Sequence, residues 1–115
     1  MLPKRVDCRE VAPVEIEGGK RQVQVLIDGA RLPNAPVALA RYTYQPLVKG
    51  PRHCHQTETE IYYCLNGSGT VTVEEEVFVM EPGVVVYIPP GKEHQTASGS
   101  RGLDFIAIFS PPLQF

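Results

Sequence analysis

A chain of 115 residues with a formal net charge of −2 is long enough for one hydrophobic core and too short for two. Its acidic and basic side chains are interspersed, and no basic run with interleaved aromatic residues indicates a nucleic-acid partner. No stretch approaches the roughly 20 apolar residues of a membrane-spanning helix, and the N-terminus lacks the apolar core of a signal peptide. The sequence therefore predicts one domain whose partners are neither nucleic acid nor a membrane.

The cysteines indicate the redox compartment, and the turn-forming residues indicate the fold class. Cys8, Cys54 and Cys64 are odd in number and form no Cys-X-X-Cys pair, which favours free thiols in a reducing, cytoplasmic setting. Eleven prolines and ten glycines are spread among many valine, isoleucine, threonine and tyrosine residues. This pattern is typical of short antiparallel strands with frequent turns, and no long run has the helical period.

Taken in chain order, residues 1–20 carry mixed charge and several turn-forming residues, and we interpret them as an N-terminal arm. Residues 21–115 form the predicted single barrel domain. Alternation of apolar and polar residues predicts strands over 21–28, 37–45, 60–65, 70–73, 77–80, 84–88, 94–97 and 103–109. A hairpin turn is predicted at residues 66–69, where two glycines tolerate positive φ, and a loop is predicted at residues 98–102.

All three histidines of the chain belong to one candidate set of metal ligands. Residues two apart on a strand point to the same face, so His53 and His55 could hold one ion from a single strand. Glu60 lies an odd number of residues further on and must follow a turn, and His94 must arrive from a third strand. Imidazole and carboxylate groups are ligands that borderline divalent metals favour. A His-X-His pair also occurs on ordinary strands, so the metal-site hypothesis needs further support from the residues around His94.

That spacing resembles a known family. The two motifs are His53-X-His55-X4-Glu60-X6-Gly67 and Gly83-X5-Pro89-X-Gly91-X2-His94, which resemble the first and second cupin motifs. The resemblance implies an all-β fold, the cupin double-stranded β-helix, an antiparallel two-sheet jelly-roll barrel with the metal inside its mouth. It also implies that His53, His55, Glu60 and His94 are the metal ligands.

Three imidazoles and one carboxylate leave two positions open on a six-coordinate ion, whereas structural zinc sites are closed. The ligand set fits one divalent ion, with iron or manganese favoured and nickel, zinc or copper possible. The resemblance implies a metal-dependent enzyme acting on a small organic molecule, and dioxygenase-type oxidoreductase chemistry is favoured. The alternatives are a non-oxidative sugar or uronate isomerase, lyase or epimerase, and a non-catalytic module that binds a small ligand.

Residues near the ligands supply candidate catalytic groups. Glu60 is either a permanent ligand or a base that swings off the metal. Tyr62 shares its strand parity and either donates a hydrogen bond into the pocket or packs in the core. Cys64 has the same parity and is either a soft ligand or a small buried hydrophobe. Arg41 or Tyr42 faces the cavity, and parity does not decide between them.

The same sequence predicts a homodimer. Its first strands are apolar, and the C-terminal segment Pro111-Pro112-Leu113-Gln114-Phe115 is apolar as well. Together they exceed the apolar surface that one small barrel can cover, so a second copy of the chain is the expected partner besides the small-molecule substrate.

Overall fold

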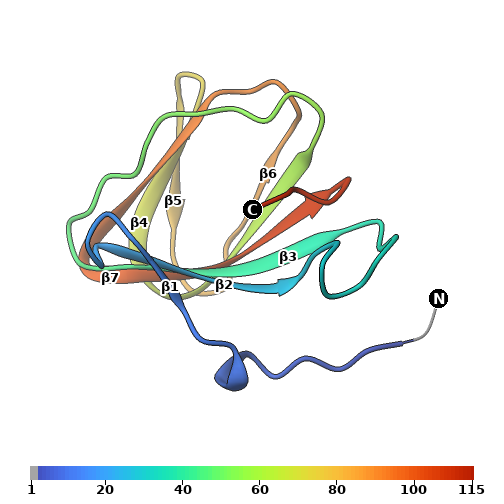
Figure 1. The fold of residues 1–115 in the computed structure, drawn as a ribbon. Helices are drawn as coiled ribbons and strands as arrows, with labels where there is room; N and C mark the ends of the chain where they lie inside the picture. The colour runs from blue at the N-terminus through green and yellow to red at the C-terminus, as the bar shows by residue number, and fades with distance from the viewer. Residues whose placement is uncertain (1–2) are drawn as a thin grey trace.

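The computed structural model describes residues 3–115. Its elements are a 3-10 helix at Cys8–Glu10 and the strands β1 Val14–Ile16, β2 Arg21–Ile27, β3 Ala38–Tyr44, β4 Thr59–Val73, β5 Glu76–Met80, β6 Val85–Ile88 and β7 His94–Ser110. Every pair of neighbouring strands is antiparallel. The sheet curves into an open barrel, with β1, β2 and β3 along one wall and β4, β5 and β6 along the other (Figure 1). The predicted all-β, antiparallel barrel is confirmed.

Two long strands, β4 and β7, join the walls. The first half of β4 pairs with β6 on one side and with the second half of β7 on the other. The second half of β4 pairs with β5 and with the first half of β7. The predicted hairpin turn at residues 66–69 and the predicted loop at residues 98–102 are therefore wrong, because both segments lie inside continuous strands.

Glycine explains why these segments bend without turning back. Gly67 and Gly102 have φ values of 80° and 74°, a region that residues with a Cβ rarely adopt. A Cβ on Gly67 would lie 2.2 Å from the Gly102 carbonyl oxygen, so only glycine lets the two backbones approach this closely. The ladder register shifts at the same place, between Gly67 and Gly69. These glycines bend two strands that stay paired, so the feature is a β-bulge and not a hairpin turn.

The core lies between the walls and follows the alternation predicted for the last strand. Leu103, Phe105, Ala107 and Phe109 are all buried. On the neighbouring β3, Ala38 pairs with Phe109, so a small side chain faces a large one and leaves room inside the barrel. Burial of an aromatic side chain of this size contributes about 1.5–3 kcal/mol, which makes these phenylalanines main contributors to stability.

The N-terminal segment adds an edge to the sheet. Strand β1 pairs antiparallel with β2 from Val14 opposite Val23 to Ile16 opposite Arg21. The Gln24 side-chain amide donates to the carbonyls of Cys8 and Val11, which ties the 3-10 helix to β2. The boundary between an arm at residues 1–20 and a domain at residues 21–115 stays a prediction. Within residues 3–115, no helix has the length and hydropathy to cross a membrane.

Candidate metal centre

The four expected ligands converge near one end of the barrel. His94 is the first residue of β7, and Glu60 lies at the start of β4. His53 joins them through a backbone bridge, in which its N–H donates to the His94 carbonyl at 3.0 Å and its carbonyl accepts from the His94 N–H at 2.8 Å. One ligand atom from each of His53, His55, Glu60 and His94 lies within 4.8 Å of the others. This arrangement could hold a metal ion.

The segment that carries two of these histidines is not the regular strand expected from their spacing. His53 makes a single isolated bridge, and His55 lies outside any strand, directly before a bend at residues 56–57. The bend is the turn that the parity of Glu60 required. His55 is positioned by packing, because its ring meets the Phe109 ring edge-on at 5.5 Å between centroids. This ring contact and one backbone hydrogen bond, from the Gly91 N–H to the His55 carbonyl at 2.8 Å, therefore aim the ligand in place of a regular ladder.

The deepest part of the cluster has the electrostatics of a cation site. Glu60 and His94 are only 2% and 1% exposed. His94 Nδ1 lies 3.1 Å from the Lys92 carbonyl and, in the neutral ring, must carry the proton to bond with that acceptor. Its Nε2 then turns a lone pair toward Glu60 Oε1, 2.8 Å away. Neither buried atom has a well-directed hydrogen-bond partner in the described chain, so two acceptors face each other across a place for positive charge.

The cluster shifts the pKa values of His94 and His53 in opposite directions. Burial lowers the pKa of His94, but the Glu60 carboxylate and the Lys92 carbonyl raise it by more, so the net shift is upward. Burial lowers the pKa of His53, and the other two histidines add to this effect. His53 Nδ1 also lies 3.1 Å from a carbonyl, that of Pro51, which leaves its Nε2 free for a metal. The donor set fits a divalent ion.

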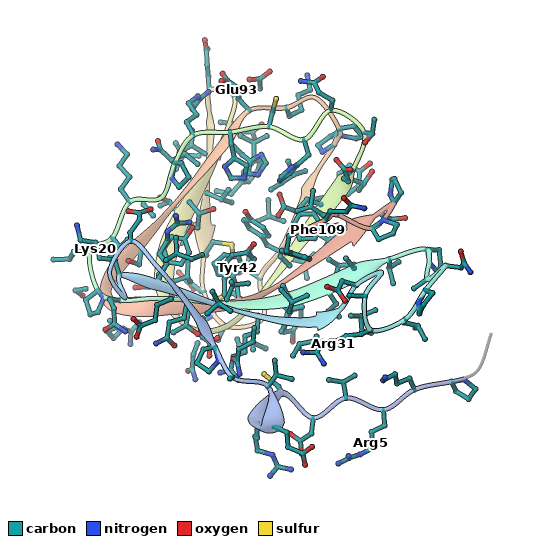
Figure 2. All side chains as sticks on the ribbon, in the orientation of Figure 1. Arg5, Lys20, Arg31, Tyr42, Glu93 and Phe109 are labelled. Carbon is teal, nitrogen blue, oxygen red and sulfur yellow. The ribbon has the colours of Figure 1, made fainter. Side chains whose placement is uncertain are left out.

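A cavity of about 180 Å³ opens beside the cluster. Its lining residues are Ile16, Arg21, Tyr42, Tyr44, Pro51, His53, His55, Glu60, Tyr62, Phe105, Phe109 and Leu113. Tyr42 and Phe109 project into the barrel interior, whereas Glu93 and Arg31 project outwards (Figure 2). Tyr42 is thus the member of the Arg41–Tyr42 pair that faces the cavity, because Arg41 is bonded to Asp104 on the other face.

Tyr62 reaches the cavity from β4 and is almost fully buried. Its hydroxyl oxygen accepts a hydrogen bond from the Thr96 hydroxyl at 3.4 Å. Burial, followed by the charge of Glu60, raises the pKa of Tyr62 well above its ordinary value. The phenol therefore keeps its proton at neutral pH and is a hydrogen-bond donor rather than a base.

Cys64 is not part of the ligand cluster. Its side chain is fully buried, and its thiol donates to the Asn66 carbonyl at 3.6 Å. Burial raises the pKa of this thiol, which keeps it protonated. Of the two interpretations of Cys64, the small buried hydrophobe is the one that the structure supports.

Sequence reasoning missed Arg21 as a residue of this site. Arg21 shares strand parity with the buried Val23, so an arginine at an inward position was the available signal. Its side chain is only 11% exposed and its guanidinium carbon lies 5.5 Å from the centre of the Tyr44 ring. Ile16, from the segment interpreted as an arm, was missed as well, because only the β1–β2 pairing brings it to the cavity.

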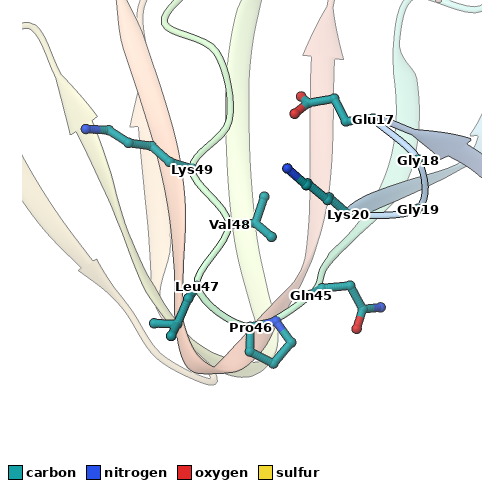
Figure 3. Close-up of a pocket in the computed structure, with 9 residues that line it drawn as sticks. All are labelled: Glu17, Gly18, Gly19, Lys20, Gln45, Pro46, Leu47, Val48 and Lys49. Carbon is teal, nitrogen blue, oxygen red and sulfur yellow. The ribbon is translucent and has the colours of Figure 1, made fainter.

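A second hollow of about 480 Å³ lies between the β1–β2 turn and residues 45–49 (Figure 3). The side chains of Lys20 and Val48 project into it, whereas Lys49 points away (Figure 3). None of the four candidate metal ligands lines this hollow. We therefore place the candidate functional site in the smaller cavity, which is lined by candidate metal ligands, although the second hollow is larger.

The fold and the centre together define a class of metal-binding β-barrel, and comparison places the chain in it. The chain belongs to the cupin family, because the Cupin_2 family model, described as a cupin domain, matches residues 40–109. The structure of KdgF from a Halomonas species has the same fold, with a TM-score of 0.84 at 19% identity over 96% of this chain and 94% of that one.

Two relatives with named activities match parts of the chain. The glucose-6-phosphate isomerase of Thermococcus gammatolerans is 40% identical over 67 residues, which are 53% of this chain and 35% of the isomerase. The dimethylsulfoniopropionate lyase DddW of Ruegeria pomeroyi is 33% identical over 92 residues, which are 80% of this chain and 60% of the lyase. The chain thus spans less than two thirds of the length of either relative.

Proposed function

We propose that this protein is a metal-dependent enzyme that catalyses a non-oxidative reaction, a lyase or isomerase step, on a small organic molecule. The observation that carries the proposal is the buried pair of facing acceptors, Glu60 Oε1 and His94 Nε2, at the wall of a cavity lined by tyrosine hydroxyls. His53, His55, Glu60 and His94 would hold an ion there, next to the cavity in which a substrate could reach it. The relatives named as an isomerase and a lyase support this chemistry.

The four side chains His53, His55, Glu60 and His94 would hold the ion. When bound, a divalent metal supplies Lewis-acid stabilisation to adjacent oxygens of a substrate. The Tyr62 hydroxyl donates a hydrogen bond into the cavity and stabilises negative charge that develops on the substrate. Glu60 remains a ligand or, released from the centre, takes a proton from the substrate. Phe105 and Phe109 exclude water from the inner wall, which strengthens these polar contacts.

Dioxygenase chemistry with iron, which the sequence favoured, is the alternative, and an oxygen test separates the two. Protein loaded with manganese or iron is incubated with glucose 6-phosphate, dimethylsulfoniopropionate and small 2-hydroxy acids, and products are followed by NMR. The expected result is conversion of at least one compound under strictly anaerobic conditions. Conversion that requires oxygen and consumes it in proportion to product would overturn the non-oxidative proposal.

The role of Tyr62 has its own variant. We expect Tyr62→Phe to lower kcat by about ten- to a hundred-fold, because it deletes one proton donor, and to leave metal content unchanged. Tyr87→Phe is the matched control, since Tyr87 is exposed on the outer face of β6. Elemental analysis and steady-state kinetics on both variants check the expectation. Equal kcat values for the two variants would assign Tyr62 to packing alone.

We propose further that the protein is a cytoplasmic homodimer. All three cysteines are free, which supports a reducing compartment. The outer face of β5 and β6 exposes Val77, Val79, Val85 and Tyr87, an apolar surface that a second copy would cover. The C-terminal tail supports a dimer less well than expected, because Phe115 already packs on Phe109 of its own chain. A monomeric mass by light scattering at micromolar concentration would end the dimer proposal.

A further inference from the structure

Arg21 is a residue of the cavity whose hydrogen bonding is incomplete. It is the only lysine or arginine side chain among the described residues that line the cavity. Its Nη2 donates to Glu17 Oε1 at 2.5 Å, but its Nε is buried and has no hydrogen-bond partner within residues 3–115. A guanidinium carries five N–H donors and stays charged in proteins, so burial without partners is costly. The position therefore favours a ligand that accepts hydrogen bonds.

The existing partner of Arg21 is placed so that it can leave. Glu17 belongs to the β1–β2 turn, where its backbone has a positive φ of 55°. Its side chain is 45% exposed, whereas that of Arg21 is 11% exposed. A carboxylate at the rim can move into water at little desolvation cost, but the guanidinium, stacked on the Tyr44 ring, cannot. Glu17 lines the second hollow and not the cavity beside the histidines, so its departure would free the Arg21 Nη2 donor for an incoming anion.

We propose that Arg21 binds a carboxylate group of the substrate, so that the cavity takes a small organic acid with its other end toward the histidine cluster. This inference rests on the proposed function and names its substrate class. One carboxylate replaces one carboxylate, which leaves the charge around Arg21 balanced when Glu17 moves away. The planar guanidinium matches the planar carboxylate in geometry as well.

Cavity size limits the acid. The cavity has a volume of about 180 Å³. A compact organic acid therefore fits it better than a bulky sugar phosphate. A phosphate dianion would also bring one negative charge more than Glu17 removes. Both considerations favour a small hydroxy or keto acid over a phosphorylated ligand.

The test uses glycolate, its uncharged analogue glycolamide and inorganic phosphate as probes. Each is titrated into manganese-loaded protein and followed by calorimetry. We expect glycolate to bind at least about ten-fold more tightly than glycolamide, which is the contribution of a charge-assisted hydrogen bond. Arg21→Gln should erase this preference while elemental analysis shows unchanged metal. A preference that survives in Arg21→Gln, or tighter binding of phosphate than of glycolate, would overturn the inference.

Two further variants guard against a trivial loss of structure. Glu17→Gln removes the competing charge without touching Arg21, and we expect it to tighten glycolate binding a few-fold. Unchanged or weaker binding would overturn the displacement of Glu17. Arg41→Gln removes an arginine from the outer face and should leave all three affinities unchanged, whereas a loss there would point to a general charge effect.

The metal-free protein separates this inference from the proposed function. Arg21 does not contact the histidines in the ligand cluster, so a preference for glycolate over glycolamide should persist, more weakly, without metal. A preference that depends on Arg21 in protein that converts no substrate would support the carboxylate site and count against the enzyme. Turnover of an uncharged compound, with no such preference, would count against the carboxylate site alone.

Discussion

Arg21 and Arg41 lie on neighbouring strands, pair with acids and face opposite sides of the sheet. Arg41 donates to both carboxylate oxygens of Asp104, which lies diagonally across on β7, opposite Thr43. Arg21 gives one hydrogen bond to a rim glutamate and keeps a buried donor without a partner. The two hydrogen bonds from Arg41 to Asp104 stabilise the fold, whereas the unpaired N–H of Arg21 remains available to a ligand in the cavity.

The Glu60–His94 pair extends the comparison to the metal cluster. Both residues are buried and both turn acceptors toward the same point, which is unfavourable unless positive charge lies between them. On the outer face, for example, Arg52 donates to the exposed Glu93. Within residues 3–115, the buried side-chain atoms without a hydrogen-bond partner are Arg21 Nε, Glu60 Oε1 and His94 Nε2, all on the inner side of the barrel, where function is proposed. Three sets of substitutions test the contrast between the inner and the outer side of the barrel.

The largest effect is expected at a glycine. Gly67→Ala places a Cβ 2.2 Å from a backbone oxygen of the facing strand, at a φ of 80°. We expect a loss of about 3 kcal/mol or more in the free energy of unfolding, from strain and forced backbone displacement. Gly83→Ala is the control, because its φ of 92° is equally unfavourable but nothing lies within 4 Å of the added Cβ. Urea denaturation measures both; equal losses would show that φ strain alone acts.

The next effect concerns the cluster itself. Glu60→Gln should weaken metal binding by about a hundred-fold, because a charged ligand becomes a neutral amide. In metal-free protein at a pH where His94 is neutral, the same change should stabilise the fold by about 1 kcal/mol, since the new amide N–H can donate to Nε2. Glu93→Gln, at the exposed rim, is the matched control. Metal titration and thermal melts measure both effects.

A melting temperature of metal-free Glu60→Gln below that of the parent protein would contradict the idea of two facing acceptors. Unchanged metal affinity in this variant would remove Glu60 from the ligand set. Either result would weaken the contrast between the inner and outer polar groups.

The smallest effect is expected on the outer face. Arg41→Gln should lower the free energy of unfolding by about 1 kcal/mol, since the pair with Asp104 is bidentate but partly exposed. Metal affinity and turnover should not change. A salt series of denaturation curves checks the assignment, because the difference between parent and variant should shrink as ionic strength rises. A change in turnover would show that the outer pair is coupled to the cavity.

From the sequence alone, the resemblance of the two motifs to those of cupins predicted the fold class and the members of the ligand cluster. Alternation on the last strand predicted that Leu103, Phe105, Ala107 and Phe109 face one side, because side-chain direction has a period of two on any strand. The spacing around His53, His55 and Glu60 predicted a turn before Glu60 for the same reason. Such local rules depend only on covalent geometry, so they hold before the chain is folded.

Only the tertiary structure decided which glycines form turns and which form bulges within a strand. Gly67 has a positive φ and lies against the Gly102 carbonyl, and this close approach depends on strand pairing that the sequence does not show. It also decided that Tyr42 rather than Arg41 faces the cavity, because the turn before the ligand segment interrupts the inward and outward alternation of side chains. The inward position of Arg21 was readable from its strand, but its missing hydrogen bond was not. Whether a buried donor is satisfied depends on groups that are distant in the sequence, and only folding brings them together.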